Sequence, residues 1–196
     1  MNGMELEFSK ADASDASILN GISKSAFDSD VEVGAPSKGG PPGYGSLSFH
    51  AEMARQNHLF KLTDHGRIVG GAILFPDKDM LNVGRIFVSP EHFRKGYGTH
   101  MMQEIEAMFP DAKGFTLDTP IWNVRTNRFY TKLGYSEIRR DGEVVYYLKK
   151  LARVGPKNDE KRPAPKSPPA LLALPLHGNA AGCRIPGSEV AGGKLC

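Results

Sequence analysis

A glycine-containing segment between an apolar stretch and a helical pattern has the composition of an anion-binding loop. It reads Phe93-Arg94-Lys95-Gly96-Tyr97-Gly98-Thr99 and follows the apolar stretch 81–88. The first backbone N–H groups of a helix have no intrahelical acceptor, and the helix dipole places partial positive charge on them. Glycine lets a phosphate approach the backbone closely, and the Arg and Lys side chains add positive charge. The segment therefore predicts a site for a phosphate-bearing ligand.

Two other phosphate-binding motifs fit this segment poorly. A Walker A loop closes an eight-residue pattern with Gly-Lys-Ser/Thr, which is absent here. A dinucleotide-binding fingerprint needs a third glycine three residues after Gly98, where this sequence has Met101. Asp118 stands about 20 residues downstream, where a ribose-binding acid would be, so a nucleotide-binding domain stays open as a minor alternative.

A second segment, residues 123–135, begins with Asn123, places Tyr130 seven residues later, and ends in Leu133-Gly134-Tyr135. Together with Val88-x-Pro90 and the glycine-containing loop, it resembles the GNAT superfamily of acyl-CoA-dependent N-acetyltransferases. That family has Arg/Gln-x-x-Gly-x-Gly/Ala followed by an Asn, Tyr, Leu-Gly-Phe/Tyr motif, and both spacings match. The resemblance covers most of residues 1–151 in element order, and its specific residues lie within 81–135.

One position departs from the family pattern. Phe93 stands where the family has Arg or Gln, three residues before Gly96, and a phenyl ring cannot donate to a phosphate. We expect Arg94 or Lys95, together with backbone N–H groups, to bind the phosphates instead.

The resemblance implies that acetyl-CoA is the co-substrate and that no metal site is present. It implies that the loop backbone binds the pyrophosphate and that backbone groups of a split strand hold the pantetheine arm. The implied cofactor-binding residues are Ile86, Phe87, Val88, Arg94, Lys95, Gly96, Tyr97, Gly98, Thr99 and Asn123. Asn123 also fits a helix N-cap. Gly84 indicates either a bulge in that strand or close packing.

Tyr130 corresponds to the family tyrosine that protonates the leaving thiolate. A phenol with a pKa near 10 stays protonated at neutral pH and can donate to a developing anion. The alternative is a core tyrosine on the buried face of its helix.

The acceptor implied by the resemblance is a primary amine of a small molecule or a peptide, which attacks the thioester directly. The loop from Asp28 to Leu47 lies where the family covers its acceptor site, and its acids Asp28, Asp30 and Glu32 would attract a cationic amine. Candidates for a general base, none of them preferred, are Glu32, His50, Glu52 and Asp118.

A second class of function is a non-catalytic acyl-CoA-binding or sensing module with the same fold. Phe93 favours this alternative, because it removes a phosphate donor, whereas Tyr130 favours an enzyme.

Composition divides the 196 residues into an acidic-to-neutral domain and a basic tail. Residues 1–151 carry 18 Lys+Arg and 19 Asp+Glu, and residues 152–196 carry 7 and 3. The domain has no excess positive charge typical of nucleic-acid binding. The tail holds 7 Pro, 6 Gly and no aromatic residue, so we expect disorder there. A native extension and a non-native segment remain equal hypotheses for it.

Both cysteines, Cys183 and Cys196, lie in that tail, which excludes a disulfide scaffold for the domain. Neither a signal peptide nor a membrane-spanning run is recognisable, so we expect a cytoplasmic protein without a membrane partner, either a monomer or a homodimer.

The elements that must position these residues follow from periodicity and turn residues. We expect strands at Glu5–Lys10, His58–Thr63, Arg67–Phe75, Leu81–Val88, Gly114–Thr119, Tyr135–Arg139 and Val144–Lys149, and helices at Ala13–Phe27, 46–56, Gly98–Phe109 and Val124–Leu133. Asp12 is the expected cap of the first helix. Expected buried residues are Ile18, Leu19, Ile22 and Phe27 on the first helix and Met101, Met102, Ile105, Met108 and Phe109 on the third.

The strand Leu81–Val88, the helix after it and the strand Gly114–Thr119 form a right-handed βαβ unit with a parallel pair. The flanking hairpins require antiparallel pairing. We therefore predict a single α/β (α+β) domain with a mixed, curved sheet of six to seven strands and helices on both faces.

Overall fold

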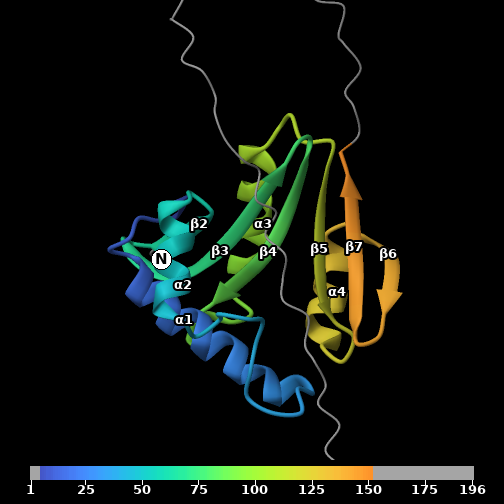
Figure 1. Ribbon diagram of the computed structural model, residues 1–196, viewed down its shortest axis with the longest axis horizontal. Coiled ribbons are helices and arrows are strands. Elements are labelled where there is room, and N and C mark those ends of the chain that lie inside the picture. The colour runs from blue at the N-terminus through green and yellow to red at the C-terminus, as the bar shows by residue number, and fades with distance from the viewer. Residues whose placement is uncertain (1–4, 152–196) are drawn as a thin grey trace, which may run out of the picture. The chain divides into compact units, whose positions relative to one another are not determined.

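A seven-stranded mixed sheet forms the centre of the computed structural model, which describes residues 5–151 (Figure 1). The strand order is β1-β2-β3-β4-β5-β7-β6. The strands are β1 (Leu6–Lys10), β2 (Leu59–Asp64), β3 (Arg67–Asp77), β4 (Met80–Val88), β5 (Gly114–Pro120), β6 (Ser136–Asp141) and β7 (Val144–Lys150). The predicted mixed α/β fold is confirmed. The predicted tail, residues 152–196, lies outside the described residues.

Helices cover both faces of this sheet (Figure 1). They are α1 (Ala16–Asp28), α2 (Leu47–Arg55), α3 (Tyr97–Met108) and α4 (Val124–Lys132), with short 3₁₀ helices η1 (Ser29–Val33) and η2 (Pro90–His92). Residues of α1 and α2 pack with Ile73 and Phe87 in one buried cluster. Residues of α3 and α4 pack with the opposite face of the sheet in a second cluster.

The predicted parallel pair and hairpins are confirmed. β4 and β5 run parallel, while β2–β3 and β6–β7 are antiparallel neighbours. Gly134 has φ +87° directly after α4, and Gly142 has φ +55° in the last hairpin turn. Glycine adopts this left-handed region without the steric cost of a side chain, which explains why the chain reverses there.

The first helix begins later than predicted, at Ala16. The Asp12 carboxylate accepts a hydrogen bond of 2.7 Å from the Ser14 backbone, so it holds a turn before the helix rather than capping α1. Ser46, in contrast, caps α2 by accepting from Phe49 N.

Two predicted core residues are wrong. Ile18 is 54% exposed on α1 and Met108 is 40% exposed at the end of α3. Ile18 and Met108 each stand at the margin of the buried face of their helix, so that the buried face is narrower than predicted. The segment 28–47 is also more ordered than a loop, since it begins with η1.

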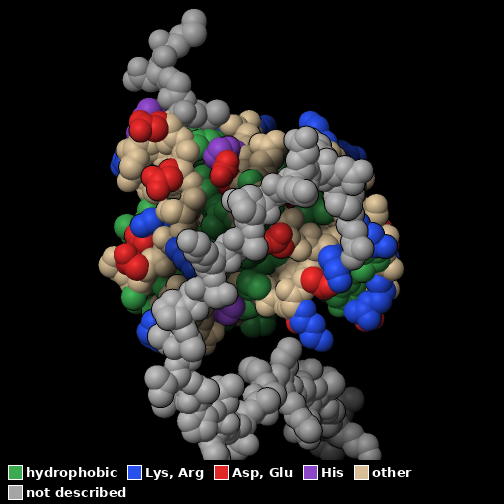
Figure 2. Space-filling view, turned by 90° about the horizontal axis from the view of Figure 1, so that it is seen from above, with side chains coloured by type: hydrophobic (Ala, Val, Ile, Leu, Met, Phe, Trp, Pro, Cys, Tyr) green, Lys and Arg blue, Asp and Glu red, His purple; other side chains and the backbone are tan. Residues whose placement is uncertain are grey.

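The outer strand β6 is exposed along its whole length. It carries Arg139 and Arg140. Lys and Arg side chains gather on the side of β6 and β7, at the right in Figure 2. Charges on an edge strand oppose pairing with other chains. Within residues 5–151 no helix is long and apolar enough to cross a membrane.

Candidate active site

β4 and β5 pair only at their beginnings. Three parallel pairs join Met80–Asn82 to Gly114–Thr116, and Val83–Val88 have no partner on β5. At the last pair the Asn82 side chain donates to the backbone oxygen of Thr116 at 3.4 Å and to its hydroxyl at 3.2 Å. The two strands therefore leave an opening between them after residue 82, with an unpaired backbone edge on β4.

A bulge at Gly84 changes which side chains of β4 face each side of the sheet. Ile73 pairs with Arg85 and Leu74 pairs with Val83, so Gly84 has no partner. A Cβ at Gly84 would lie 2.6 Å from the Phe75 ring, so close packing and the bulge occur together. Before the bulge Val83 faces α3, and after it Phe87 faces α1 and α2.

Ile86 and Val88 direct their backbone groups toward the opening. Ser89 N donates to Val69 O of β3 at 2.8 Å, so Ser89 and Val69 face each other as a hydrogen-bonded pair. Hydrogen-bonded and non-hydrogen-bonded pairs alternate in an antiparallel ladder. The pairs Val88–Gly70 and Ile86–Ala72 are therefore of the non-hydrogen-bonded kind. Their N–H and C=O groups point away from β3, toward the place where β5 is missing.

The loop before α3 offers a row of free backbone donors. Among the described residues, none accepts a hydrogen bond from the backbone N–H groups of residues 94–99. Arg94 and Gly96 have φ +62° and +84°, and a Cβ at Gly96 would meet nothing within 4 Å. Alternating backbone conformations of this kind gather N–H groups into an anion-binding concavity at a helix N-terminus. The loop thus presents free backbone donors at the beginning of α3, and its binding of a phosphate stays a prediction.

Gly98 faces α4 at van der Waals range. A Cβ there would lie 3.4 Å from Phe129 Cζ. Tyr97, by contrast, has a buried ring that stacks on His92, and its hydroxyl donates to the Asp64 carboxylate. Its side chain anchors the loop to β2, and only its backbone is available to a ligand.

Asn123 is the N-cap of α4, as predicted. It is 2% exposed, and its Oδ1 accepts a hydrogen bond of 3.1 Å from Thr126 N. Its side chain also lies close enough to the Asp30 carboxylate to favour the ionised form and so to lower the pKa of Asp30, against the larger effect of burial. The asparagine therefore caps α4 beside η1.

Tyr130 lies in the core cluster on the α3 side of the sheet. Its ring packs against Phe129 and Tyr135, with centroids 5.1 Å and 5.9 Å away. Among the described residues its hydroxyl has no hydrogen-bond partner. Burial, with a smaller effect from the negative charge of Asp118, raises the pKa of Tyr130 far above 10. The phenol is therefore neutral at physiological pH and can donate a proton.

The four candidate bases lie in different surroundings. Asp118 stands two residues past the last β4–β5 pair. Its side chain reaches solvent, but the surrounding protein excludes enough water to raise its pKa. His50 is fully buried, and burial lowers its pKa. Glu52 is engaged with Arg55 and Gln56, and Glu32 is exposed. Only Asp118 lies on the strands that form the opening.

Three residues of this region were not found by sequence reasoning, namely Asp30 as a buried partner, Arg85 and Arg125. Arg125 Nη2 donates to Asp30 Oδ1 at 2.7 Å. The position of Arg85 depends on the bulge at Gly84, which alternation alone does not locate. Arg125 stands inside the second motif, two residues after the N-cap Asn123. Its positive charge at this position was the one feature of the sequence that could have indicated a buried acidic partner.

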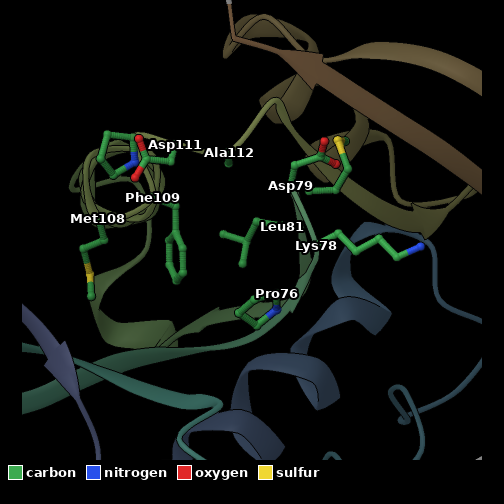
Figure 3. Close-up of a pocket in the computed structure, with 10 residues that line it drawn as sticks. Pro76, Lys78, Asp79, Leu81, Met108, Phe109, Asp111 and Ala112 are labelled. Carbon is green, nitrogen blue, oxygen red and sulfur yellow. The ribbon is translucent and has the colours of Figure 1, made fainter. Parts of the chain in front are cut away.

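A pocket of about 200 Å³ lies elsewhere, at the C-terminal end of α3 (Figure 3). Leu81 and Phe109 face it, and Met108 and Pro76 lie at its sides. The glycine-containing loop is at the other end of α3, about 18 Å away at 1.5 Å per residue. This pocket therefore takes no part in the opening between β4 and β5.

Comparisons with known proteins agree with this geometry. The sequence model of the acetyltransferase (GNAT) domain matches residues 55–137. No curated protein is significantly similar in sequence.

Several solved structures share the fold. The PaiA N-acetyltransferase of Thermoplasma acidophilum, in complex with coenzyme A, has a TM-score of 0.66 at 16% identity, over 76% of this chain and 100% of that one. A GNAT-family acetyltransferase of Streptococcus agalactiae has a TM-score of 0.67 at 15% identity, over 77% and 99%. The ribosomal-protein-S18-alanine N-acetyltransferase of Escherichia coli has a TM-score of 0.59 at 16% identity, over 76% and 96%. Residues 55–137 thus match the sequence model of the acetyltransferase (GNAT) domain, and the described residues share the fold of these solved acetyltransferases.

Proposed function

We propose that this domain is an acetyl-CoA-dependent N-acetyltransferase, which moves the acetyl group to a primary amine of a small molecule or peptide by direct attack. The proposal rests on one observation: two groups of backbone N–H and C=O groups without hydrogen-bond partners follow one another along the chain. The unpaired edge of β4 at Ile86 and Val88 leads through η2 to the free N–H groups of residues 94–99. A long ligand with a phosphate at one end and an amide-containing arm at the other matches both.

The residues present fit acetyl-CoA. The open space at Gly96 admits a pyrophosphate, and the backbone of Arg94, Lys95, Gly96, Tyr97, Gly98 and Thr99 would hold it. Ile86, Phe87 and Val88 would hold the arm along β4, with Asn123 at the beginning of α4. When bound, acetyl-CoA supplies the acetyl thioester that the amine attacks.

Tyr130 has the proposed role of general acid. As the amine nitrogen forms its bond to the carbonyl carbon and the C–S bond breaks, the Tyr130 hydroxyl donates its proton to the leaving sulfur. Burial keeps this phenol protonated, as the raised pKa indicates. A strand N–H at the open edge can polarise the carbonyl during the attack.

The test has two measurements on the full chain. Thermal unfolding with acetyl-CoA, CoA and NAD reports binding, because a ligand that binds only the folded state raises its stability. We expect stabilisation by acetyl-CoA and CoA and none by NAD, which would also exclude a nucleotide-binding domain of the dinucleotide type. Release of free thiol with a panel of amines then reports the reaction.

A non-catalytic acyl-CoA-binding module is the second candidate, because Phe93 offers no donor to a phosphate. Stabilisation by acetyl-CoA without thiol release from any amine of the panel would support that candidate against the enzyme.

A further inference from the structure

Two opposite charges stand on either side of the opening, on the same face of the sheet. Phe87 faces α1 and α2, so Arg85, two residues before it on β4, faces the same side. Phe115 and Leu117 of β5 face α3, so Asp118 faces the α1/α2 side as well. Continuing the parallel register from Asn82–Thr116 brings Gly84 and Arg85 opposite Asp118 and Thr119.

Arg85 has no negatively charged partner among the described residues. Its guanidinium lies over the Phe49 ring, 4.6 Å from the centroid, and its Nη2 donates to the neutral carbonyl of Pro42. Its Nη1 is buried and has no hydrogen-bond partner. Arg85 as a whole is half-buried, but a buried, unpartnered N–H group on a charged side chain is costly, so this arrangement favours an anion brought by a ligand. The partial burial of Arg85 also lowers the pKa of its guanidinium, because removal from water disfavours the charged form.

Asp118 is likewise unpaired. Within residues 5–151 it forms no ion pair with Lys, Arg or His, although basic residues are numerous on β6 and β7. Its negative charge acts on Tyr130, so the carboxylate lies close to the proposed general acid. The two charges thus lie on the face of the sheet that α1 covers over β3 and β4 (Figure 1).

We propose that the acceptor is a small amino-carboxylate, a molecule with a primary ammonium group and a carboxylate, such as an amino acid. This inference rests on the proposed function and narrows its substrate class. The carboxylate of the acceptor binds the Arg85 fork at Nη1 and Nη2, replacing the Pro42 carbonyl, and its ammonium group lies at Asp118. Two parallel charge-assisted hydrogen bonds are the geometry that arginine favours with carboxylates.

The segment over Arg85 can yield to such a ligand. Pro42 is flanked by glycines at 39, 40, 43 and 45, and glycine backbone has access to more conformations than that of any other residue, so a rearrangement of this segment meets little steric resistance from its own side chains. A Cβ at Gly40 or Gly43 would lie 2.7 Å from the ring of Tyr44 or Phe49, so the segment packs closely on these two rings.

The proton transfers balance with these groups. Asp118 takes one proton from the ammonium, and the neutral amine forms the C–N bond as the C–S bond breaks. The nitrogen then loses its second proton to solvent, and Asp118 releases the proton that it took to solvent as well. Tyr130 gives a proton to the thiolate and regains one from solvent. The products are the amide, the free thiol and one net proton. Asp118 suits this role because its raised pKa makes it a stronger base than an ordinary aspartate.

The decisive experiment compares matched acceptors on the full chain with acetyl-CoA. Each amino acid of a panel is tested beside its carboxamide, which keeps the amine and the side chain but not the negative charge. We expect kcat/KM for the best acid to exceed that of its amide by about 10- to 150-fold, the value of a charge-assisted hydrogen bond. Amides or simple alkylamines that react as well as the acids would overturn the proposal and leave the acetyltransferase function intact. Acetyl-CoA binding without thiol release from any amine would instead overturn the proposed function.

Variants locate the recognition. Arg85→Gln should bring the acid-to-amide ratio close to one, Arg85→Lys should retain part of it, and the exposed control Arg67→Gln should leave it unchanged. A binding measurement complements the rates: with CoA present, thermal stabilisation by the best acid should disappear in Arg85→Gln. A ratio that stays at the wild-type value in a folded Arg85→Gln protein would show that the carboxylate binds elsewhere.

Discussion

The guanidinium of Arg125 lies over the ring of Phe93, 4.9 Å from its centroid, and connects the glycine-containing loop to α4. The same guanidinium donates to Asp30, whose side chain is only 12% exposed. One arginine therefore joins the loop, the beginning of α4 and η1. Phe93, which cannot bind a phosphate itself, has a structural role as the surface on which this arginine rests.

Replacing Arg125 should destabilise the fold. In Arg125→Gln the Asp30 carboxylate keeps its burial and loses its cation, so we expect a loss of about 1–3 kcal/mol in the free energy of unfolding. Burial already raises the pKa of Asp30 against the attraction of Arg125. The loss should therefore shrink as the pH falls and Asp30 becomes protonated. Urea unfolding at two pH values measures both effects.

The matched control is the double variant Asp30→Asn/Arg125→Gln, which removes the charge together with its partner. It should recover part of the stability lost in the single variant. If it is less stable by the sum of both single effects, the two side chains are energetically independent.

Gly96→Asp should weaken acetyl-CoA binding by at least about tenfold. The side chain would enter the open space beside the free N–H groups, and its charge would repel a phosphate. Gly96→Asn is the matched control, because it has the same shape and the same backbone demand at φ +84° without the charge. Equal affinity of the two variants would show that charge at this position does not matter; unchanged affinity in both would remove Gly96 from the site.

Tyr130→Phe should lower kcat by about 10²–10⁴-fold, the usual range for general acid catalysis. The ring and its packing remain, so acetyl-CoA affinity should change little. Tyr135→Phe is the control, since Tyr135 is buried in the same aromatic cluster. Thiol release and a separate binding titration measure the two quantities. Turnover within about threefold of wild type would make Tyr130 a core residue only.

Asp118→Asn should increase stability at neutral pH while it lowers the reaction rate. Because the folded protein raises the pKa of Asp118 above 3.8, ionisation of this carboxyl costs folding free energy at pH values above its folded pKa. The cost disappears below the unfolded value. The melting temperature of the variant should therefore exceed that of wild type near pH 7 and approach it near pH 3.5.

Asp15→Asn provides a control of opposite sign. It breaks the ion pair of 2.7 Å with Lys61, so its melting temperature should fall at neutral pH. If Asp118→Asn is also less stable than wild type at neutral pH, the carboxylate has a stabilising partner that outweighs its burial.

The helices and strands can be predicted from the sequence because capping and turn residues act on their immediate neighbours. Asn123 caps α4 and Gly134 follows it, and these positions depend only on neighbouring residues. Phe93 and Arg125 are 32 positions apart in the sequence, and their contact depends on how β4 and β5 diverge. Long-range contacts of this kind leave no periodic pattern, which is why Asp30, Arg85 and Arg125 were not recognised as a site.

The bulge at Gly84 has a consequence for how this protein can change. In a regular strand every second side chain lies on the same side of the sheet. In β4 this alternation shifts by one residue at Gly84. The side chains of Arg85 and Phe87 therefore lie on the side of α1 and α2, whereas those of Ile86 and Val88 lie on the side of α3. If the proposed function holds, substitutions at Arg85 and Phe87 can change the preference for the acceptor and leave the proposed binding of acetyl-CoA along β4 unchanged.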